Sequence, residues 1–425
     1  MRVLIVNTSE RTGGAAVAAN RLMDALINNG VKARMMVGEK ESEELTVAAA
    51  GGRWHRQWSF LWERWCVFCA LHFQRAGLFD IDIANAGVDI TRTREFREAD
   101  IIHLNWVNQG MLSLRGVKKI VNSGKPIVWT MHDFWPATAI CHYPGECRSY
   151  ISGSCHNCVY LPNGGSANDL SSRVWRHKAA IWRRANIHFV ACSRWLADKA
   201  RQSGLLTGKT VTAIPNPIDS RLYHPSDKTA ARRRLSLPLD KRLVLFVSQR
   251  VTNRRKGMHY LIEACAKLNA AYPGMSQNTA VVILGGHAEE CASQIAFPVY
   301  PLGYVNDEKR IIDVYNAADL FVLPSLEDNL PNTIMEAMAC GVPCVAFKTG
   351  GIPEMIEHKK TGYVAEYMSS DDLAAGMAWA LREADTKTLS DNAVRKVATQ
   401  YSQQSVAMRY IEVYNQVAAL NPYGL

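Results

Sequence analysis

The sequence lacks any run that reaches the roughly 18 apolar residues of a membrane-spanning helix. Its N-terminus, MRVLIVNTSE, also lacks a charged and then apolar leader ahead of a small-residue cleavage site, so we expect a cytoplasmic protein. Low-complexity tracts and short-period repeats are absent as well. The 425 residues are 48% hydrophobic and 21% charged, which is typical of a globular protein of two or three domains.

The excess of basic residues lies almost wholly in the first half of the chain. Residues 1–220 hold 27 Lys and Arg against 18 Asp and Glu, a net charge of +9, whereas residues 221–425 carry +1. This asymmetry indicates an anionic partner for the first half, and charge alone leaves open phospholipid, lipid pyrophosphate and nucleic acid. A solvated basic surface is the alternative.

Short apolar runs alternate with helical stretches along the chain. MRVLIVNT leads into a turn at Gly13 and Gly14 and a helix that ends at Gly30, and the alternation recurs through KPIVWTMHD and ANIHFVACS. After the Pro- and Asp-rich stretch AIPNPIDSRLYHPSD it begins again near residue 225. The pattern predicts an α/β fold of two Rossmann-like domains, residues 1–220 and 221–400, facing across a cleft.

The segment LPSLEDNLPNTIMEAMACG carries the clearest chemistry. Asp328 precedes Glu336 by eight residues, and Glu336 falls in the first turns of a predicted helix. Unpaired N–H groups and a positive dipole end make the start of a helix a phosphate site, while a carboxylate further along accepts bonds from ribose hydroxyls. A capped core helix is the alternative, but it leaves the preceding loop unexplained. The phosphate-binding backbone is predicted at Leu330, Pro331, Asn332 and Thr333.

Cations follow the first strand of the second domain. SQRVTNRRKG contains Arg250, Arg254, Arg255 and Lys256, and fixed cations there would stabilise the charge that develops on a departing nucleotide diphosphate. A solvated turn accounts for Arg254 and Arg255 but poorly for Arg250.

In the first domain, His132 ends the strand KPIVWTMHD, where it can donate a hydrogen bond to a sugar hydroxyl or buffer charge. A structural histidine is the alternative. Asp133 is expected to orient His132 or to bind an acceptor. Gly13 and Gly14 let the backbone approach a phosphate or an acceptor closely.

Together these motifs resemble glycosyltransferase family 4, retaining enzymes with the two-domain GT-B fold. The resemblance, to bacterial exopolysaccharide and colanic-acid-type transferases in particular, covers nearly the whole chain and includes HLNW, IPNPID, LGYV and YNAADLFVLPS. It implies an acceptor-binding first domain, a nucleotide-sugar-binding second domain, and a last helix, about 402–420, that packs back on the first. It implies catalytic roles for His132, Asp328 and Glu336, and donor contacts from Gly14, Arg250, Lys256, Tyr304 and Glu336.

The same resemblance implies a reaction. A hexose would pass with retention from a UDP- or GDP-type nucleotide diphosphate sugar to a lipid-linked saccharide at the inner membrane surface, in exopolysaccharide or lipopolysaccharide biosynthesis and without a catalytic metal or nucleic acid. One position departs from the family motif Glu-x7-Glu, because Asp328 occupies the first position and Glu327 stands immediately before it.

Four cysteines fall within eighteen residues, in the pattern C-x5-C-x7-C-x2-C. In a cytosolic chain such thiols are poor candidates for disulfides, and tetrahedral zinc takes four thiolates brought together by turns. We expect a structural zinc site, with His142 and His156 as substitute ligands and an ordered loop of reduced cysteines as the alternative. A zinc-bearing nucleic-acid-binding protein and a non-catalytic GT-B scaffold are the competing functions. The predicted ligands are Cys141, Cys147, Cys155 and Cys158.

Residues 53–75 place four tryptophans at helical spacing beside several arginines: Trp54, Trp58, Trp62 and Trp65, with Arg53, Arg56, Arg64 and Arg75. Tryptophan with basic residues on one helix suits a membrane interface, and a stripe packed into the core is an equally good interpretation.

Overall fold

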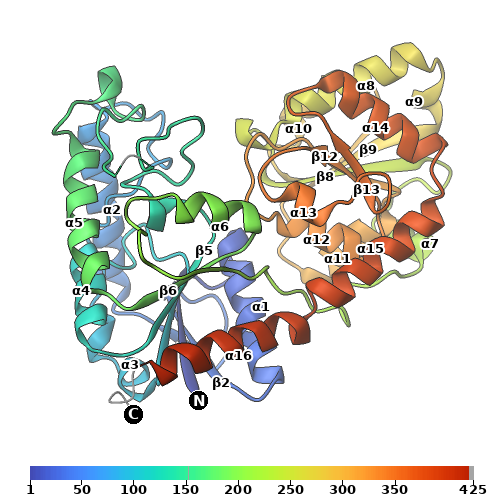
Figure 1. Ribbon diagram of the computed structural model, residues 1–425. Helices are drawn as coiled ribbons and strands as arrows, with labels where there is room; N and C mark the ends of the chain where they lie inside the picture. Colours follow the sequence, from blue (N-terminus) through green and yellow to red (C-terminus); the bar gives the residue numbers. More distant parts are fainter. Residues whose placement is uncertain (152, 421–425) are drawn as a thin grey trace. The chain divides into compact units, whose positions relative to one another are not determined.

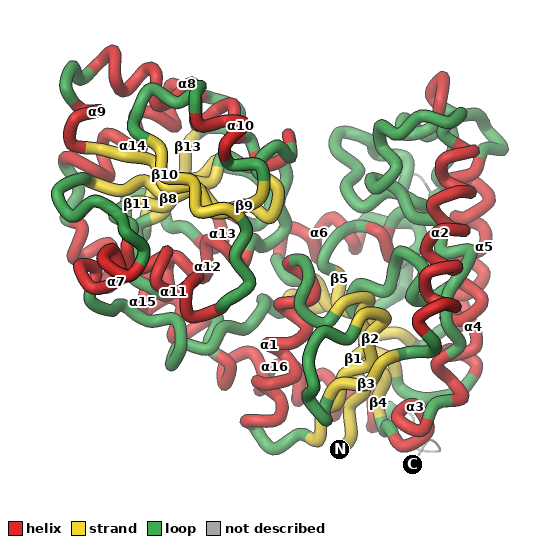
Figure 2. The backbone as a smooth tube through the Cα atoms, turned by 180° about the vertical axis from the view of Figure 1, so that it is seen from behind, coloured by secondary structure: helices red, strands yellow, loops and turns green. Residues whose placement is uncertain are grey.

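The computed structural model describes residues 1–151 and 153–420, in which the chain divides into two compact units (Figures 1 and 2). Unit 1 comprises Met1–Pro217 and the segment from Gln403 onward, and unit 2 comprises Ile218–Ser402. Each unit is one parallel sheet covered by helices on both faces, so the predicted α/β fold with two Rossmann-like domains is confirmed. In the part of the chain that the structure describes, no helix is both long and apolar enough to cross a bilayer.

Unit 1 contains a seven-stranded sheet in the order β3-β2-β1-β4-β5-β6-β7. Every residue of the central strands β4 to β6 is buried, as expected for parallel strands with helices on both faces. The order reverses between β1 and β4, and ligands bind at such switch points outside the carboxyl ends of the strands. The strands are β1 (Arg2–Ser9), β2 (Lys32–Glu39), β3 (Val47–Ala49), β4 (Ile101–Leu104), β5 (Ile127–Met131), β6 (Ile187–Ala191) and β7 (Val211–Ala213).

Two helices cover one face of this sheet and four pack in the core on the other. Figure 1 shows α1 and α16 together on the first of these faces. The helices of unit 1 are α1 (Gly14–Asn28) and α16 (Gln403–Ala419) on that face, then α2 (Arg53–Ala70), α4 (Leu114–Asn122), α5 (Leu170–Arg184) and α6 (Arg194–Arg201) on the other, with the short α3 (Arg94–Glu98) and the 3₁₀ turns η1 (Ile90–Arg92), η2 (Trp135–Ala137) and η3 (Pro162–Gly164).

Helix α16 is bound to the sheet through buried polar groups. His103 Nδ1 lies 2.6 Å from the Tyr414 hydroxyl and its Nε2 lies 2.7 Å from Thr130 Oγ1, which in turn meets the Tyr410 hydroxyl at 2.9 Å. Burial lowers the pKa of His103 to about 3, so the imidazole is neutral. Each polar atom has a partner, and this network fixes how the last helix docks on β4 and β5.

Unit 2 contains a six-stranded sheet in the order β10-β9-β8-β11-β12-β13, which reverses between β8 and β11. Figures 1 and 2 show α8, α9, α10 and α14 on one face and α7, α11, α12 and α15 on the other. The strands are β8 (Arg242–Arg250), β9 (Thr279–Gly286), β10 (Val299–Gly303), β11 (Leu320–Leu323), β12 (Cys344–Phe347) and β13 (Gly362–Ala365). The helices are α7 (Lys228–Arg234), η4 (Arg254–Lys256), α8 (Met258–Ala271), α9 (Met275–Asn278), α10 (Glu289–Ala292), α11 (Glu308–Ala317), α12 (Asn332–Ala339), α13 (Ile352–Met355), α14 (Ser370–Arg382) and α15 (Thr386–Gln400).

Candidate active site

The loops that follow β8, β11 and β12 meet at the switch point of unit 2. The Leu326 amide donates to the Arg255 carbonyl at 2.7 Å, and Thr349 Oγ1 donates to the Leu326 carbonyl at 3.1 Å. Two glycines with positive φ make this approach possible. A Cβ on Gly257 would lie 1.8 Å from the Pro324 carbonyl oxygen, and one on Gly350 would lie 1.7 Å from that of Asp328. The three loops therefore form one compact unit around Asp328.

Asp328 is buried and is held by three side-chain donors. Lys256 Nζ lies 2.5 Å from its Oδ2, Ser325 Oγ donates to the same oxygen at 2.9 Å, and Arg255 Nη1 lies 3.5 Å from Oδ1. Burial alone would raise the pKa of Asp328, but the two cations outweigh burial and hold this pKa below its usual value. Asp328 is therefore a carboxylate near neutral pH.

Arg255 and Glu327 stand next to Lys256 and Asp328 in the sequence, and the structure distinguishes the members of each pair. Arg255, which the sequence favoured as a solvated side chain, is half-buried and donates to the Glu327 carbonyl at 2.5 Å as well as facing Asp328. That interpretation of Arg255 is wrong. Asp328, and not Glu327, carries the carboxylate that Lys256 meets. The sequence does not indicate which of Arg254, Arg255 and Lys256 face Asp328, because this depends on the 3₁₀ turn η4.

Glu336 lies in the second turn of α12 and is buried. Its Oε2 accepts a 2.7 Å hydrogen bond from the hydroxyl of Tyr315, a residue of α11 that the sequence did not single out. Burial, with Glu336 next to it, raises the pKa of Tyr315 well above its ordinary value, so this hydroxyl stays a donor. One oxygen of Glu336 is thus fixed from within the protein.

The start of α12 has the features of a phosphate site. The helix begins at Asn332 after Pro331, whose side chain cannot cap the first amides. Thr333 Oγ1 is buried without a hydrogen-bond partner, and buried polar atoms of this kind are rare in folded proteins. Leu330 is also buried, so the loop before the helix is packed and not loose.

The two further predicted donor contacts, Arg250 and Tyr304, follow different strands of the unit 2 sheet. Arg250, the last residue of β8, is exposed, and its Nε donates to Thr252 Oγ1 at 3.3 Å. Tyr304 follows the edge strand β10, which β9 separates from β8, and is largely exposed. Arg250, Asp328 and Glu336 therefore share the switch point, whereas Tyr304 lies at the far strand.

In unit 1, His132 lies immediately after β5 and is half-buried. Its Nε2 lies 3.0 Å from Asn105 Oδ1 and its Nδ1 lies 3.5 Å from the sulfur of Cys192. Burial lowers the pKa of His132 to about 4, so it is a neutral hydrogen-bonding group at pH 7. Gly13 has a φ of +95°, and Gly14 begins α1, which has no side-chain cap. These groups lie at the carboxyl edge of the unit 1 sheet.

Asp133 belongs to a different network. It accepts hydrogen bonds from His142 Nδ1 at 2.7 Å and from the indole of Trp106 at 2.8 Å, and the other ring nitrogen of His142 lies 2.6 Å from Asp82. These two carboxylates raise the pKa of His142 to about 10 against the effect of its burial. Asp133 therefore holds a charged histidine, and His142 is not available as the substitute zinc ligand that we expected.

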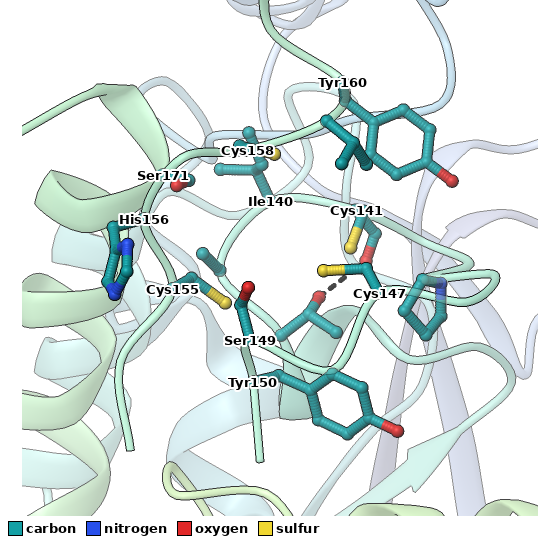
Figure 3. Close-up of a pocket in the computed structure, with 14 residues that line it drawn as sticks. Ile140, Cys141, Cys147, Ser149, Tyr150, Cys155, His156, Cys158, Tyr160 and Ser171 are labelled. Atoms are coloured by element: carbon teal, nitrogen blue, oxygen red, sulfur yellow. Dashed lines mark hydrogen bonds between the residues drawn. The ribbon is translucent and has the colours of Figure 1, made fainter. Parts of the chain in front are cut away.

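Cys141, Cys147, Cys155 and Cys158 line one small cavity of about 20 Å³ in the long connection between β5 and α5 (Figure 3). Burial raises the pKa of the Cys155 thiol to about 12 and also raises that of Cys141 and Cys158. His156 borders the same cavity, and its Nδ1 accepts from Asn157. Within residues 1–151 and 153–420, no three His, Cys, Asp or Glu side chains are grouped closely enough to hold a metal ion.

Comparison with known proteins agrees with this geometry. The chain matches the family model for group 1 glycosyl transferases over residues 227–397 and that for glycosyltransferase family 4 over residues 12–222. An uncharacterized glycosyltransferase of Methanocaldococcus jannaschii is 30% identical over 360 residues, which is 79% of this chain and 89% of that protein. D-inositol 3-phosphate glycosyltransferase of Thermobispora bispora is 29% identical over 218 residues, so the chain spans only about half (50%) of that relative's length.

Solved structures show the same fold. Sucrose-phosphate synthase of Thermosynechococcus elongatus superposes with a TM-score of 0.68 at 18% identity over 99% of both chains. Anabaena HepE, solved in complex with UDP-glucose, superposes with a TM-score of 0.64 at 17% identity over 98% of this chain and all of its own. The two-sheet architecture and its loops thus define a GT-B glycosyltransferase. The chain belongs to glycosyltransferase family 4, as the resemblance of its motifs implied.

Proposed function

We propose that this glycosyltransferase is a retaining hexosyltransferase, which uses a UDP- or GDP-type nucleotide sugar and a lipid-linked saccharide acceptor in bacterial exopolysaccharide or lipopolysaccharide biosynthesis. The observation that carries the proposal is the loop from Asp328 to Glu336 at the switch point of unit 2, with cations at its edge. The UDP-glucose complex of Anabaena HepE supports a nucleotide-sugar donor. Action from the cytoplasm, at the inner membrane surface, follows from a lipid-linked acceptor.

The donor site would lie in unit 2. The amides at the start of α12 and the unpaired Thr333 hydroxyl suit the diphosphate, because both are donors held in place before a ligand arrives. Arg250 adds a cation at the same edge. Glu336, held in place by Tyr315, would accept hydrogen bonds from the ribose hydroxyls.

In the reaction, the bond between the anomeric carbon and the diphosphate oxygen breaks and the acceptor oxygen bonds to that carbon on the same face, while the acceptor hydroxyl gives its proton to the departing diphosphate. Positive charge develops at the sugar and negative charge on the departing diphosphate. Asp328 is ionised and would stabilise the sugar end, while Arg250 stabilises the diphosphate. In unit 1, the neutral His132 would hydrogen-bond a sugar hydroxyl.

A nucleotide screen tests the proposal directly. Thermal unfolding of the protein with UDP, GDP or ADP should show a rise in the midpoint with UDP or GDP. Glu336→Gln should reduce that rise, and Glu263→Gln, an exposed carboxylate of α8, should leave it unchanged. Radiolabelled transfer from the matching sugar nucleotide to a lipid-linked acceptor should retain the anomeric configuration. Full activity in Glu336→Gln would remove this loop from the active site.

We propose in addition a structural zinc bound by Cys141, Cys147, Cys155 and Cys158. The donor set suits tetrahedral zinc, and all four thiols line one cavity, although their side chains do not converge as ligands. Elemental analysis of freshly reduced protein should find about one zinc per chain, and Cys155→Ser should lower both zinc content and the unfolding midpoint. Cys265→Ser, at a buried cysteine of α8, is the control and should keep the zinc. Metal-free protein would favour the ordered-loop alternative.

A further inference from the structure

Helix α2 exposes an aromatic face. Trp54, Trp58, Leu61, Trp62 and Trp65 keep 77, 69, 56, 56 and 53% of their surface exposed. Their spacing of four, three, one and three residues places them along one side of the helix. The structure thus rules out the interpretation of this stripe as core.

The opposite face of α2 is fixed by buried polar contacts. Glu63 accepts from the amides of Ile83 at 3.0 Å, Ala84 at 2.6 Å and Gly110 at 2.9 Å. The neighbouring Arg64 forms a buried ion pair with Asp82. Turning the helix to hide the tryptophans would take Glu63 and Arg64 away and leave Asp82 and the three amides buried without these partners, which is strongly unfavourable. The aromatic face therefore stays outward in the folded unit.

The apolar surface continues past the end of the helix. Trp65 contacts Phe68 with 6.0 Å between ring centroids, Phe68 contacts Phe73 at 5.5 Å, and both Phe73 and Phe79 are mostly exposed. Scattered exposed apolar residues are ordinary, but a contiguous surface of this kind marks an interaction site. We call the exposed side chains the α2 face: Trp54, Trp58, Leu61, Trp62, Trp65, Phe73 and Phe79.

Charge identifies the partner. Glu63 is the only carboxylate between Arg53 and Phe79, and it is fully buried. Arg53, His55 and Arg75 are exposed around the α2 face, and residues 1–220 carry a net charge of +9. Tryptophan rings belong at the headgroup depth of a bilayer, and arginines beside them meet lipid phosphates. Helix α2 is too polar to span a bilayer, so it would lie in the plane of the interface.

We propose that the α2 face docks the protein on the surface of an anionic phospholipid bilayer, with the helix axis parallel to the membrane. This inference names the membrane contact that the proposed function requires. It does not depend on sugar transfer, because docking is measured on vesicles that contain neither donor nor acceptor.

Vesicle flotation tests the docking. The full chain should float with vesicles of phosphatidylcholine and phosphatidylglycerol, bind phosphatidylcholine alone weakly, and show a blue shift of tryptophan emission on binding. Trp58→Gln together with Trp62→Gln should lower partitioning by about tenfold or more, because two interfacial rings are lost. Leu239→Gln changes a side chain that is 51% exposed in unit 2, and it should have no effect.

The ionic part has its own matched pair of variants. Arg53→Gln should weaken binding to the anionic vesicles about fivefold at low salt, as expected for one basic residue at the surface. Arg92→Gln removes an arginine that is 88% exposed elsewhere on unit 1 and should bind as the wild type does. Equal thermal midpoints and nucleotide-induced shifts in all variants would show that folding and the donor site are intact.

Three outcomes would overturn the proposal: no flotation of the wild type with anionic vesicles, equal losses in the variants and their controls, or a dimer in light scattering that the tryptophan variant dissociates. The last result would assign the α2 face to a second copy of this chain. Vesicle binding without any nucleotide-induced shift would instead count against the proposed donor site and leave the docking intact.

Discussion

The pair of Lys256 and Asp328 gives the sharpest test of the site, through Asp328→Asn. The wild-type carboxylate is buried, and the ammonium of Lys256 lies 2.5 Å from it. Removing one partner of a buried ion pair costs about 3 to 5 kcal/mol. The Lys256 side chain keeps 19% of its surface exposed and Arg255 keeps 30%, so water relieves part of that cost. We therefore expect a loss of about 2 to 3 kcal/mol in the unfolding free energy of unit 2.

For a unit of this size the loss corresponds to a fall of about 5 to 10 °C in the unfolding midpoint. Turnover should fall strongly, whereas nucleotide diphosphate affinity should hold or improve, because the variant frees a cation. Calorimetry and initial rates measure the two effects. Asp371→Asn is the control, since Asp371 pairs with Lys267 on the surface of the same unit and should cost no more than about 0.5 kcal/mol.

The stability of the protein should also depend on pH through the same carboxylate. The pKa of folded Asp328 lies below its value in the unfolded chain. Its contribution to stability is therefore complete above pH about 3.9 and is lost as the pH falls through the folded value. The stability difference between wild type and Asp328→Asn should shrink below pH about 4. If Asp328→Asn had the same unfolding midpoint as Asp371→Asn and kept its turnover, the roles assigned to Asp328 in stability and in the reaction would be wrong.

Two other predictions concern the remaining motif residues. Glu336→Gln should raise the donor KM and lower kcat in steady-state assays. Tyr315→Phe should raise the donor KM less, because it removes only the group that orients Glu336. An unchanged donor KM in both variants would contradict the contact between Glu336 and the ribose. The pKa of His132 is about 4 in the folded protein and about 6.5 in the unfolded chain, so its contribution to stability is present above pH 6.5 and is lost as the pH falls toward 4. Over that range the unfolding midpoint of the wild type should fall further than that of His132→Asn. Parallel curves of midpoint against pH would contradict the burial of His132.

The fold was predictable because its signals are local. Apolar runs such as LVLFV in β8 and glycine turns such as that before α1 record the alternation of strand and helix directly in the sequence. The position of Glu336 on a helix after a loop was predictable for the same reason. The order of the strands in unit 2 explains why Arg250 and Asp328, far apart in sequence, lie at the ends of neighbouring strands.

Contacts between side chains from distant elements were not predictable in this way. Tyr315 donates to Glu336 from another helix, and no spacing of residues in the sequence predicts this contact. Asp133 stands next to His132 but binds His142 instead, because consecutive side chains after a strand point to different sides. The tryptophans of α2 fit core and surface equally well as a pattern, and only the buried partners of Glu63 and Arg64 decide which face is outward.

The arrangement of the cations ranks the two residues assigned to the donor diphosphate. Arg250 is exposed at the end of β8, whereas Lys256 is already engaged by Asp328. Arg250→Ala should therefore weaken nucleotide diphosphate binding by about 2 to 3 kcal/mol, the range for a lost charge-assisted contact, and Lys256→Ala should weaken it less. Titration calorimetry decides the ranking, with Arg242→Ala, at the opposite end of β8, as the control. Equal losses in both variants would mean that the donor draws Lys256 away from Asp328 when it binds, and the stabilising pair would then be a feature of the free enzyme alone.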